Sequence, residues 1–237
     1  MALLLITTAN SPPRGIPFLQ MTNPATRSVT AKAAVFFWAA LGIEKIVIAD
    51  ATDGTLLSLD DIGNLTRMGV EIEQIAYQQD NSLVTLKGKG FAEGQLIKFA
   101  LDNSELMRGE DNFFKCTGKF YCRNFEVINQ LIKQENLQNI FWQFFSENLT
   151  PYRWVDLRFF YASKKFCSEH LIPAYLMGDD SKNTASEFFC FNRISEELTA
   201  AKTIRPLMSG FGGFNNQLSF DLSLGALDFQ YPSWFGK

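Results

Sequence analysis

The chain has 237 residues, of which 46% are hydrophobic and 20% charged, and its formal net charge at pH 7 is −3. This length and composition predict a single domain over residues 1–237, with a core large enough for independent stability. The weakly acidic balance argues against a nucleic-acid partner, which would need a basic surface to neutralise its phosphates. No apolar run approaches the roughly 18 residues that a membrane-spanning helix needs.

The four cysteines show no C-x-x-C spacing and are accompanied by a single histidine. We therefore expect reduced core thiols in a cytoplasmic protein, and no metal site. The apolar run near the N-terminus has no basic segment before it, which predicts a buried strand rather than a signal peptide. The 23 phenylalanines must mostly lie in the core, but such a surplus also suits an apolar surface against a membrane or a partner.

Apolar runs alternate with helical patterns in the first part of the chain. The expected elements are strands at 3–7, 45–50 and 71–77 and helices at 29–41 and 57–68. Three strand–helix units in this length predict a parallel, doubly wound sheet with right-handed crossovers. Such sheets bind ligands at the carboxyl ends of their strands, and Arg14 and Arg27 lie in or near the loop after the first strand.

The stretch KGKGFAEG, at 87–94, precedes a helical pattern. We expect a loop in which Gly88 and Gly90 let backbone amides approach a ligand, while Lys87 and Lys89 place positive charge beside them. An anion such as a phosphate fits this chemistry. A solvated turn before an ordinary amphipathic helix explains the same residues equally well.

A strand is expected at 112–121, with the sequence NFFKCTGKFY. Because side chains two residues apart share a face of a strand, Lys115, Thr117 and Lys119 would form one polar, cationic face. The opposite face would carry apolar side chains. This pattern predicts a second source of positive charge near the KGKG stretch.

After residue 124 the pattern is more mixed. The expected elements are helices at 125–137 and 164–176, strands at 140–145 and 154–160, a loop at 178–183, and a capping box from Thr184 to Glu187 that opens a helix to about residue 200. No repeat or low-complexity linker interrupts the chain. We therefore divide the single domain into a ligand-binding half, 1–124, and a second half with a C-terminal tail, 125–237.

The order of elements through residue 124 resembles that of a glycosyltransferase of the GT-A type, in which a Rossmann-like half binds a nucleotide sugar. More narrowly, the segments KGKGFAEGQLIKFAL, FFKCTGKFYCRN, WVDLRFF and SEFF resemble a group of small bacterial transferases of capsule and lipopolysaccharide biosynthesis. The resemblance covers about residues 3–190. It implies a GT-A-like, mainly parallel sheet flanked by helices, with a mixed C-terminal part.

GT-A enzymes usually carry an Asp-x-Asp motif at this place, which holds a divalent metal on the donor diphosphate. This chain has Lys115-Cys-Thr-Gly-Lys119 instead. Lysines could stabilise the charge of a departing diphosphate without a metal or other cofactor, so we expect a metal-independent enzyme. Lysine in place of the arginine that this group often has would give up bidentate phosphate geometry.

The resemblance implies a set of donor-binding residues, namely Thr8, Asp50, Lys87, Gly88, Lys89, Gly90, Glu93, Lys115, Thr117, Gly118 and Lys119. Asp50 would lie near the base or ribose, although a turn aspartate is an equal alternative. Glu93 would contact substrate or orient a lysine, although a carboxylate in a first helical turn is favoured by the helix dipole in any case. Thr117 and Gly118 would admit the sugar phosphate, or simply pack.

An inverting transferase needs a base to deprotonate the acceptor hydroxyl, and Asp156 and Glu187 compete for that role. Each also has a structural explanation. Glu187 completes the predicted capping box, and Asp156 could pair with Arg158.

The resemblance therefore implies transfer of a sugar from a nucleotide-sugar donor to a glycan or lipid-linked acceptor, with peripheral contact to the inner membrane. One alternative is a sugar nucleotidyltransferase, although the Gly-rich loop that such enzymes carry after the first strand is absent here. Another is a non-catalytic binding protein with a degenerate transferase fold, which the missing Asp-x-Asp motif favours. The donor, the acceptor and the anomeric outcome stay open.

Overall fold

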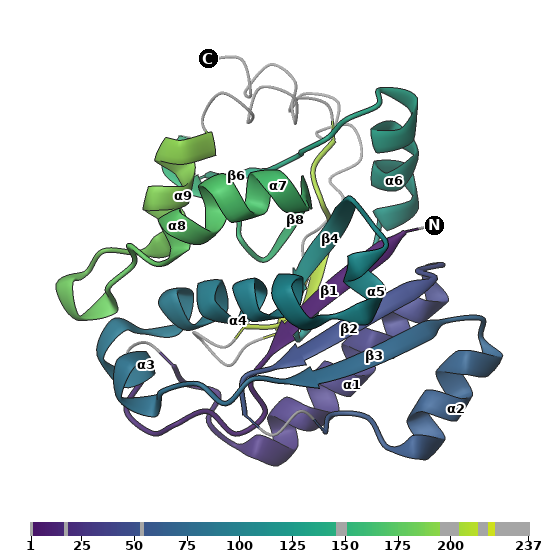
Figure 1. Cartoon of the computed structure of the whole chain (residues 1–237), viewed down its shortest axis with the longest axis horizontal. Helices are drawn as coiled ribbons and strands as arrows, with labels where there is room; N and C mark the ends of the chain where they lie inside the picture. The colour runs from purple at the N-terminus through teal and green to yellow at the C-terminus, as the bar shows by residue number, and fades with distance from the viewer. Residues whose placement is uncertain are drawn as a thin grey trace.

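Strand β1 (Leu3–Thr8) lies at the centre of a five-stranded sheet with the order β3–β2–β1–β4–β8 (Figure 1). The computed structural model describes residues 2–16, 19–52, 55–145, 151–194, 204–212 and 218–220. β1 pairs in parallel with β2 (Lys45–Asp50) and β4 (Asn112–Thr117), and β2 pairs in parallel with β3 (Glu71–Ala76). The antiparallel strand β8 (Phe159–Ser163) completes the sheet beside β4. The predicted Rossmann-like, mainly parallel sheet is confirmed.

Two helices cross over between the first three strands, and both begin at sequence signals. α1 (Pro24–Ala40) begins after Asn23, whose side chain accepts a hydrogen bond from a first-turn backbone N–H. α2 (Leu59–Arg67) begins with a capping box at Ser58. The predicted helices at these places are confirmed. The first begins earlier than its apolar pattern, because Pro24 is a favourable first helical residue.

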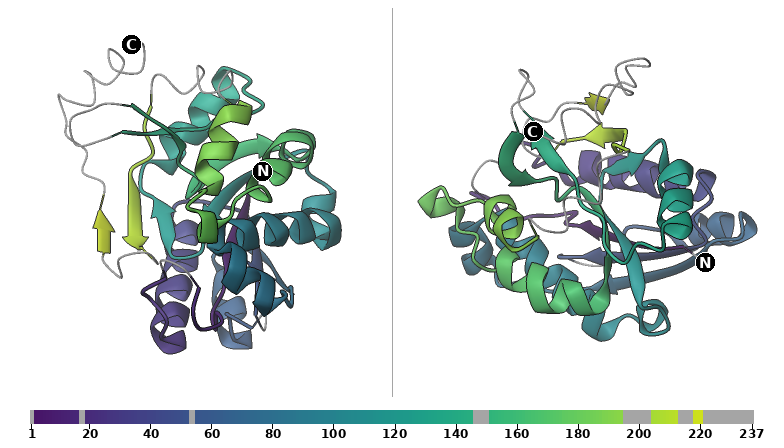
Figure 2. Two further views of the ribbon diagram at one scale, coloured as in Figure 1. Left: turned by 90° about the vertical axis from the view of Figure 1, so that its left-hand side faces the viewer. Right: turned by 90° about the horizontal axis from the view of Figure 1, so that it is seen from above.

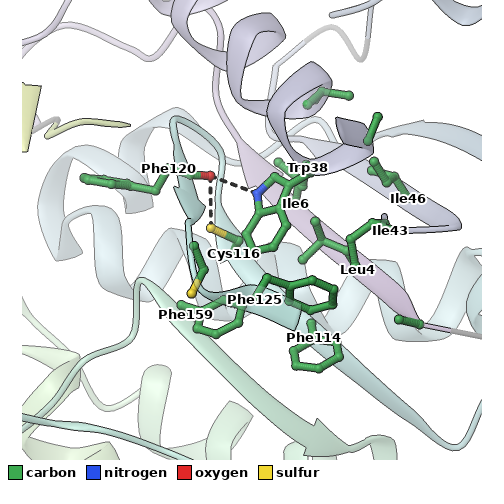
Figure 3. Packing of buried hydrophobic residues seen from close by; sticks show 14 of the residues in the cluster. Leu4, Ile6, Trp38, Ile43, Ile46, Phe114, Cys116, Phe120, Phe125 and Phe159 are labelled. Carbon is green, nitrogen blue, oxygen red and sulfur yellow. Dashed lines mark hydrogen bonds between the residues drawn. The ribbon is translucent and has the colours of Figure 1, made fainter. Parts of the chain in front are cut away.

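Alternate residues of β1 point to opposite faces of the sheet, so each face has its own core. Leu4 and Ile6 pack on the side of α1, α2 and α6 (Phe125–Gln134). Trp38 lies at the middle of this core, fully buried, and its indole N–H donates a hydrogen bond to the carbonyl of Phe120 at 3.0 Å (Figure 3). The indole therefore ties α1 to the segment that follows β4.

The second core is formed by Leu3 and Leu5 of β1 with helices on the opposite face. α4 (Lys89–Asn103) and the short α5 (Glu105–Arg108) contribute to this core, together with the helical chain from Cys167 to Tyr175. Figure 1 shows α4 lying across the sheet on the side away from α1 and α2. The resulting three layers, helix, sheet and helix, leave the ends of the strands as the edges at which side chains from many elements can meet.

The rest of the chain adds two small antiparallel units beside the main sheet (Figure 2). β9 (Met208–Phe211) pairs with both β5 (Phe120–Cys122) and β10 (Leu218–Phe220). β6 (Gln143–Phe145) pairs with β7 (Pro151–Val155). These units are the mixed C-terminal part that the sequence predicts. Of the tail, residues 213–217 and 221–237 lie outside the described residues.

A continuous helical segment follows β8 and confirms the helix expected at 164–176. It consists of α7 (Lys164–Phe166), a π-helical turn (Cys167–Leu171) and α8 (Ile172–Tyr175). A short 3-10 turn (Asp180–Lys182) then leads to α9 (Ser186–Ile194). Residues 195–203, where this last helix was expected to continue, lie outside the described residues.

The predicted capping box of the last helix is wrong. The Thr184 hydroxyl donates a hydrogen bond to the carbonyl of Asp179 at 3.0 Å, and the two residues form an isolated antiparallel bridge. α9 consequently begins at Ser186, one residue later than a cap at Thr184 would place it. Glu187 is therefore not used as a cap partner of Thr184.

The predicted loop at 87–94 is also wrong. α3 (Asn81–Lys87) ends where α4 begins, and Gly88 alone separates the two helices. Gly88 can do so because its φ of +90° lies in the region that favours glycine. Lys89, Gly90 and Glu93 therefore lie in the first two turns of a helix rather than in a mobile loop.

Two predicted strands are each interrupted by a turn. The strand at 112–121 ends at Thr117, because the chain turns there into β5: the N–H of Lys119 donates back to the carbonyl of Thr117 at 2.7 Å. The strand at 154–160 is divided into β7 and β8, because the Asp156 carboxylate accepts the backbone N–H of Arg158 and closes a turn. The alternation of polar and apolar side chains is the same for one continuous strand and for two strands joined by a turn, so the sequence pattern does not distinguish them.

All four cysteines are free and buried, as the sequence predicts. Most phenylalanines of the described residues lie in the two cores, and the exposed ones include Phe37 on α1 and Phe188 on α9. Over the ranges that the structure describes, no helix is both long enough and apolar enough to cross a bilayer.

Candidate functional site

A cavity of about 320 Å³ lies at the carboxyl ends of β1, β2 and β4. Its walls also include the first turns of α4, the turn before β8, the end of α8 and the start of α9. The predicted site residues that line it are Thr8, Lys89, Gly90, Glu93, Thr117, Lys119 and Glu187. This is the edge at which parallel α/β sheets bind ligands, so the fold brings these residues together where one is expected.

Glu93 connects three elements at the floor of this cavity. Its Oε1 accepts hydrogen bonds from the hydroxyls of Thr7, at 2.6 Å, and Thr117, at 3.0 Å. The same oxygen forms an ion pair with Lys115 Nζ at 2.7 Å. Its Oε2 has one partner among the described residues, the hydroxyl of Tyr175 at 3.5 Å. One carboxylate oxygen is thus saturated by the protein, and the other keeps most of its capacity to accept hydrogen bonds.

Lys115 lies beneath the cavity and is fully buried. Besides Glu93, its ammonium donates to the carbonyl of Leu157 at 2.6 Å and to the hydroxyl of Thr117 at 2.9 Å. These three partners match the three N–H donors of an ammonium group. Lys115 does not line the cavity, so the structure places this predicted donor-binding residue beneath the site rather than in it. The physical reason is that α4 covers its face of β4, so Lys115 supports Glu93 instead.

Lys119 has the opposite environment, although it lies only four residues further on. Its side chain lines the cavity, and the residue is 6% exposed. Within the described part of the chain its Nζ forms no hydrogen bond and no ion pair. Burial, and secondarily the positive charge of Arg27, lower the pKa of Lys119 to about 7. An amine that lacks a partner in a low-dielectric cavity is a candidate binding group for an anion.

Two arginines reach the same cavity. Arg27 of α1 is buried, and it donates to the carbonyls of Ala9, at 2.5 Å, and Met21, at 2.8 Å. Burial lowers the pKa of Arg27, and the nearby charge of Asp50 opposes that effect. Arg158 lies in the turn before β8 and is held by the carboxylate of Asp156 through its Nε and Nη2. With Lys89 and Lys119, these side chains make the cavity cationic on several sides.

The two candidate bases lie in different places. Glu187 lines the cavity, and burial raises its pKa, with Glu93 adding to that effect through its negative charge. Asp156 is not among the lining residues, and its carboxylate is engaged with Arg158, whose Nη2 lies 2.7 Å from Asp156 Oδ2. The geometry therefore favours Glu187 as a group that could exchange a proton with a ligand. Asp156 orients an arginine.

Asp50 stabilises the loops at this edge of the sheet and does not line the cavity. It is fully buried, and its carboxylate accepts the backbone N–H of Asn10, at 3.1 Å, and of Thr52, at 2.7 Å. These bonds join the loop after β1 to the loop after β2. The alternative that Asp50 is a turn aspartate therefore describes it better than contact with a donor.

The glycines of the KGKG stretch allow close packing of protein on protein. A Cβ at Gly88 would collide with the carboxylate of Asp180, and one at Gly90 would collide with the hydroxyl of Ser186. That Asp180 carboxylate accepts the backbone N–H of Lys89 at the N-terminus of α4. Gly88 therefore gives room to a carboxylate of the chain itself, and it is not among the residues that line the cavity.

Two further predicted residues lie outside the cavity lining. The ammonium of Lys87 lies over the ring of Phe91, 4.8 Å from its centroid. Gly118 packs against β1, where a Cβ would approach the carbonyl of Thr7 to 2.7 Å. Gly118 still matters for the site, because it permits the turn that places Lys119 in the cavity.

Arg27, Arg158 and Tyr175 line the cavity but are not among the predicted site residues. Arg27 is expected in or near the loop after the first strand, and Asn23-Pro24 is the sequence signal that α1 begins before it. Arg158 was assigned to a strand face. Tyr175 carries no local signal, since it reaches the cavity only because α8 packs on α4, where Gly94 leaves room for its ring.

No model of a known protein family matches this chain, and no curated protein matches it. Across the described ranges, no three His, Cys, Asp or Glu side chains come together in a group that could hold a metal ion.

Proposed function

We propose that the protein is a glycosyltransferase that moves a sugar from a nucleotide-sugar donor to a glycan or lipid-linked acceptor of the bacterial envelope, in lipopolysaccharide or capsule. We propose further that it does so without a divalent metal. The single observation that carries this proposal is the cavity at the carboxyl ends of β1, β2 and β4, whose lining combines Arg27, Lys89 and Lys119.

A diphosphate is the part of such a donor that this charge suits. As the bond between sugar and phosphate breaks, negative charge accumulates on the leaving diphosphate and needs fixed positive charge nearby. Lys119 is buried beside Arg27 and is about half protonated near pH 7 because its pKa is about 7. The negative charge of a bound diphosphate would raise the pKa of Lys119, so the lysine would become fully protonated when the ligand binds.

Glu93 supports recognition of the sugar. Its Oε1 is occupied by Thr7, Thr117 and Lys115, whereas its Oε2 has only the long contact with Tyr175. A carboxylate oxygen with spare acceptor capacity binds hydroxyl groups well. Because Lys115 neutralises the carboxylate from beneath, Glu93 can stand near a diphosphate without strong repulsion.

Glu187 supports the acid–base part of the reaction. A carboxylate that takes a proton from an acceptor hydroxyl is more effective when its pKa is raised, and burial raises the pKa of Glu187. The rest of the lining is largely apolar and offers room for the less polar parts of a nucleotide; it includes Pro12, Pro13, Ile16, Leu19 and Val84.

The first experiment is calorimetric titration of the purified protein with UDP-, GDP-, dTDP- and CMP-sugars, each with and without EDTA. We expect one nucleotide class to bind equally well in both conditions. Lys119→Met should weaken that binding by at least about tenfold, since a hydrogen bond between charged groups contributes roughly 1.5–3 kcal/mol. Lys98→Met is the matched control, because Lys98 is exposed and pairs with Asp102 away from the cavity.

Release of free nucleotide in the presence of glycan acceptors then tests turnover. Tight binding without release, under any acceptor tried, would favour the non-catalytic binding protein. Formation of a nucleotide sugar from a nucleoside triphosphate and a sugar phosphate would favour the nucleotidyltransferase. Binding that disappears with EDTA would overturn the metal-independent mechanism, and no binding of any donor would overturn the proposal itself.

A further inference from the structure

Lys119 is held on a rigid base, with its amine in the cavity. Its backbone N–H donates to the carbonyl of Thr117 at 2.7 Å, and its carbonyl accepts the N–H of Phe211 at 3.1 Å. Gly210 of β9 packs directly on that carbonyl. The main chain on both sides of the side chain is therefore fixed, and the amine is presented from a constrained turn rather than from a mobile loop.

The amine itself has no competing partner. Lys115 shows what a structural lysine looks like in this protein, with three acceptors around its ammonium. Lys119 is nearly as buried, yet its Nζ has no hydrogen bond or ion pair in the part of the chain that the structure describes. Burying an amine without a partner is costly, which is why such groups gather at functional sites.

We propose that Lys119 is a covalent site, whose amine forms a reversible imine with an aldehyde or ketone that carries a phosphate or carboxylate group. The nitrogen lone pair attacks the carbonyl carbon to give a carbinolamine. That intermediate then loses its hydroxyl as water, while the nitrogen gives up a proton and the C=N bond forms. The net reaction joins one amine and one carbonyl compound and releases one water, with no oxidant or reductant. This inference does not depend on the transferase proposal.

Neutral amine is the reactive form, and Lys119 supplies it at neutral pH. With a pKa of about 7, about half of its molecules are neutral at pH 7. An ordinary exposed lysine, with a pKa near 10.4, is neutral in roughly one molecule in a few thousand at that pH. This difference favours Lys119 over the exposed lysines of the same chain.

The surroundings select an anionic carbonyl compound and assist the loss of water. Arg27 and Lys89 line the same cavity as Lys119, so their positive charges can hold a phosphate or carboxylate in the space that contains its amine. Glu187 lines the same cavity, and burial raises its pKa, so a larger fraction of this residue than of an exposed glutamate carries the proton that the departing hydroxyl needs. The site thus combines a nucleophile, an anion-binding group and an acid.

The test uses pyridoxal 5′-phosphate as a phosphorylated aldehyde on the folded full chain at pH 7, followed by borohydride reduction and peptide mass spectrometry. We expect an adduct at Lys119 to form at least about 100 times faster than at exposed Lys98 or Lys165, because an ordinary exposed lysine has a far smaller neutral fraction at pH 7. Pyridoxal, which lacks the phosphate, should label Lys119 more slowly. Lys119→Arg keeps the charge, cannot form the imine, and should lose this adduct with an unchanged circular dichroism spectrum.

Equal labelling of many exposed lysines, or an unlabelled Lys119, would overturn the inference. Equal rates with pyridoxal and its phosphate would overturn the anion-binding role of Arg27 and Lys89. The same experiments test the covalent site and the proposed transferase separately. Nucleotide-sugar binding without an adduct would leave the transferase standing and remove the covalent site. An adduct without any nucleotide binding would support the covalent site alone.

Discussion

Lys115 Nζ lies 2.7 Å from Glu93 Oε1, and this ion pair joins strand β4 to the second turn of helix α4 beneath the cavity. Lys115 is fully buried, whereas the Glu93 side chain is 19% exposed. Removing one member of such a pair leaves the other charge in a low-dielectric environment, which typically costs about 3–5 kcal/mol.

We therefore expect Lys115→Met and Glu93→Gln each to lower the free energy of unfolding by several kcal/mol, while the double variant recovers part of the loss. Urea unfolding of the four proteins gives the coupling energy, expected at about 1–3 kcal/mol. The exposed Lys98–Asp102 pair is the control and should show coupling below about 0.5 kcal/mol. Additive losses at Glu93 and Lys115 would show that the two charges do not stabilise each other.

Lys119→Met should stabilise the protein while it weakens binding. The pKa of Lys119 is about 7 when folded and about 10.4 when unfolded, so the unfolded chain binds more protons between those values. The penalty is full below pH 7 and shrinks as the pH rises toward 10. We expect Lys119→Met to raise the free energy of unfolding by about 4 kcal/mol at pH 6.5, and by clearly less at pH 9.

Urea unfolding at the two pH values measures that difference, with Lys98→Met as the control that should change little at either pH. A gain that is the same at both pH values would mean that methionine stabilises by packing rather than by removing a buried charge. A loss of stability would contradict the prediction, because it would mean that the buried amine does not destabilise the folded protein.

Much of the fold follows from the sequence, because its strands are short, apolar and separated by clear helical patterns. β2 begins and ends at the predicted residues, Lys45 and Asp50, and the cavity lies at the predicted edge of the sheet. The roles of the lysines could not be predicted in the same way. Lys115 and Lys119 share a face if the strand is regular, yet the turn at Gly118 places one under the cavity and the other in it.

The roles of paired charges are equally hard to predict from the sequence. Asp156 and Arg158 lie two residues apart, and they can meet across a strand face or within a turn, so their spacing does not distinguish a catalytic base from a turn carboxylate. Tyr175 reaches Glu93 only through the packing of α8 on α4. Contacts between distant elements of this kind have no local signature.

Gly118→Ala should disturb the site through the backbone. A Cβ there would lie 2.7 Å from both the carbonyl of Thr7 and the Cβ of Thr8, and neither can move without shifting β1. We expect the free energy of unfolding to fall by about 1–3 kcal/mol. Nucleotide affinity should fall as well, because Thr8 and Lys119 line the cavity on either side of this contact.

Gly63→Ala is the matched control for that substitution. Gly63 lies within α2, and an added Cβ meets nothing within 4 Å, so alanine should stabilise the helix by about 0.5–1 kcal/mol. Thermal unfolding of both variants, with nucleotide titration, makes the comparison. If Gly118→Ala leaves both the stability and the nucleotide affinity unchanged, the turn after β4 can accommodate a Cβ, which would contradict the close packing at Gly118.

Glu187→Gln tests the base of the proposed reaction. The glutamate must be ionised to accept a proton, and burial raises its pKa above the ordinary 4.5, so wild-type turnover should fall as the pH drops through that raised value. In Glu187→Gln this acid limb should disappear, and kcat should fall by roughly 10²–10⁴-fold, with nucleotide-sugar affinity little changed.

Asp156→Asn should instead destabilise the turn that holds Arg158 and keep the acid limb. If the acid limb of the pH profile vanishes in Asp156→Asn and survives in Glu187→Gln, Asp156 is the residue that takes the proton. The turn between β7 and β8 must then open when substrate binds, because the Asp156 carboxylate is engaged with Arg158 in the free protein.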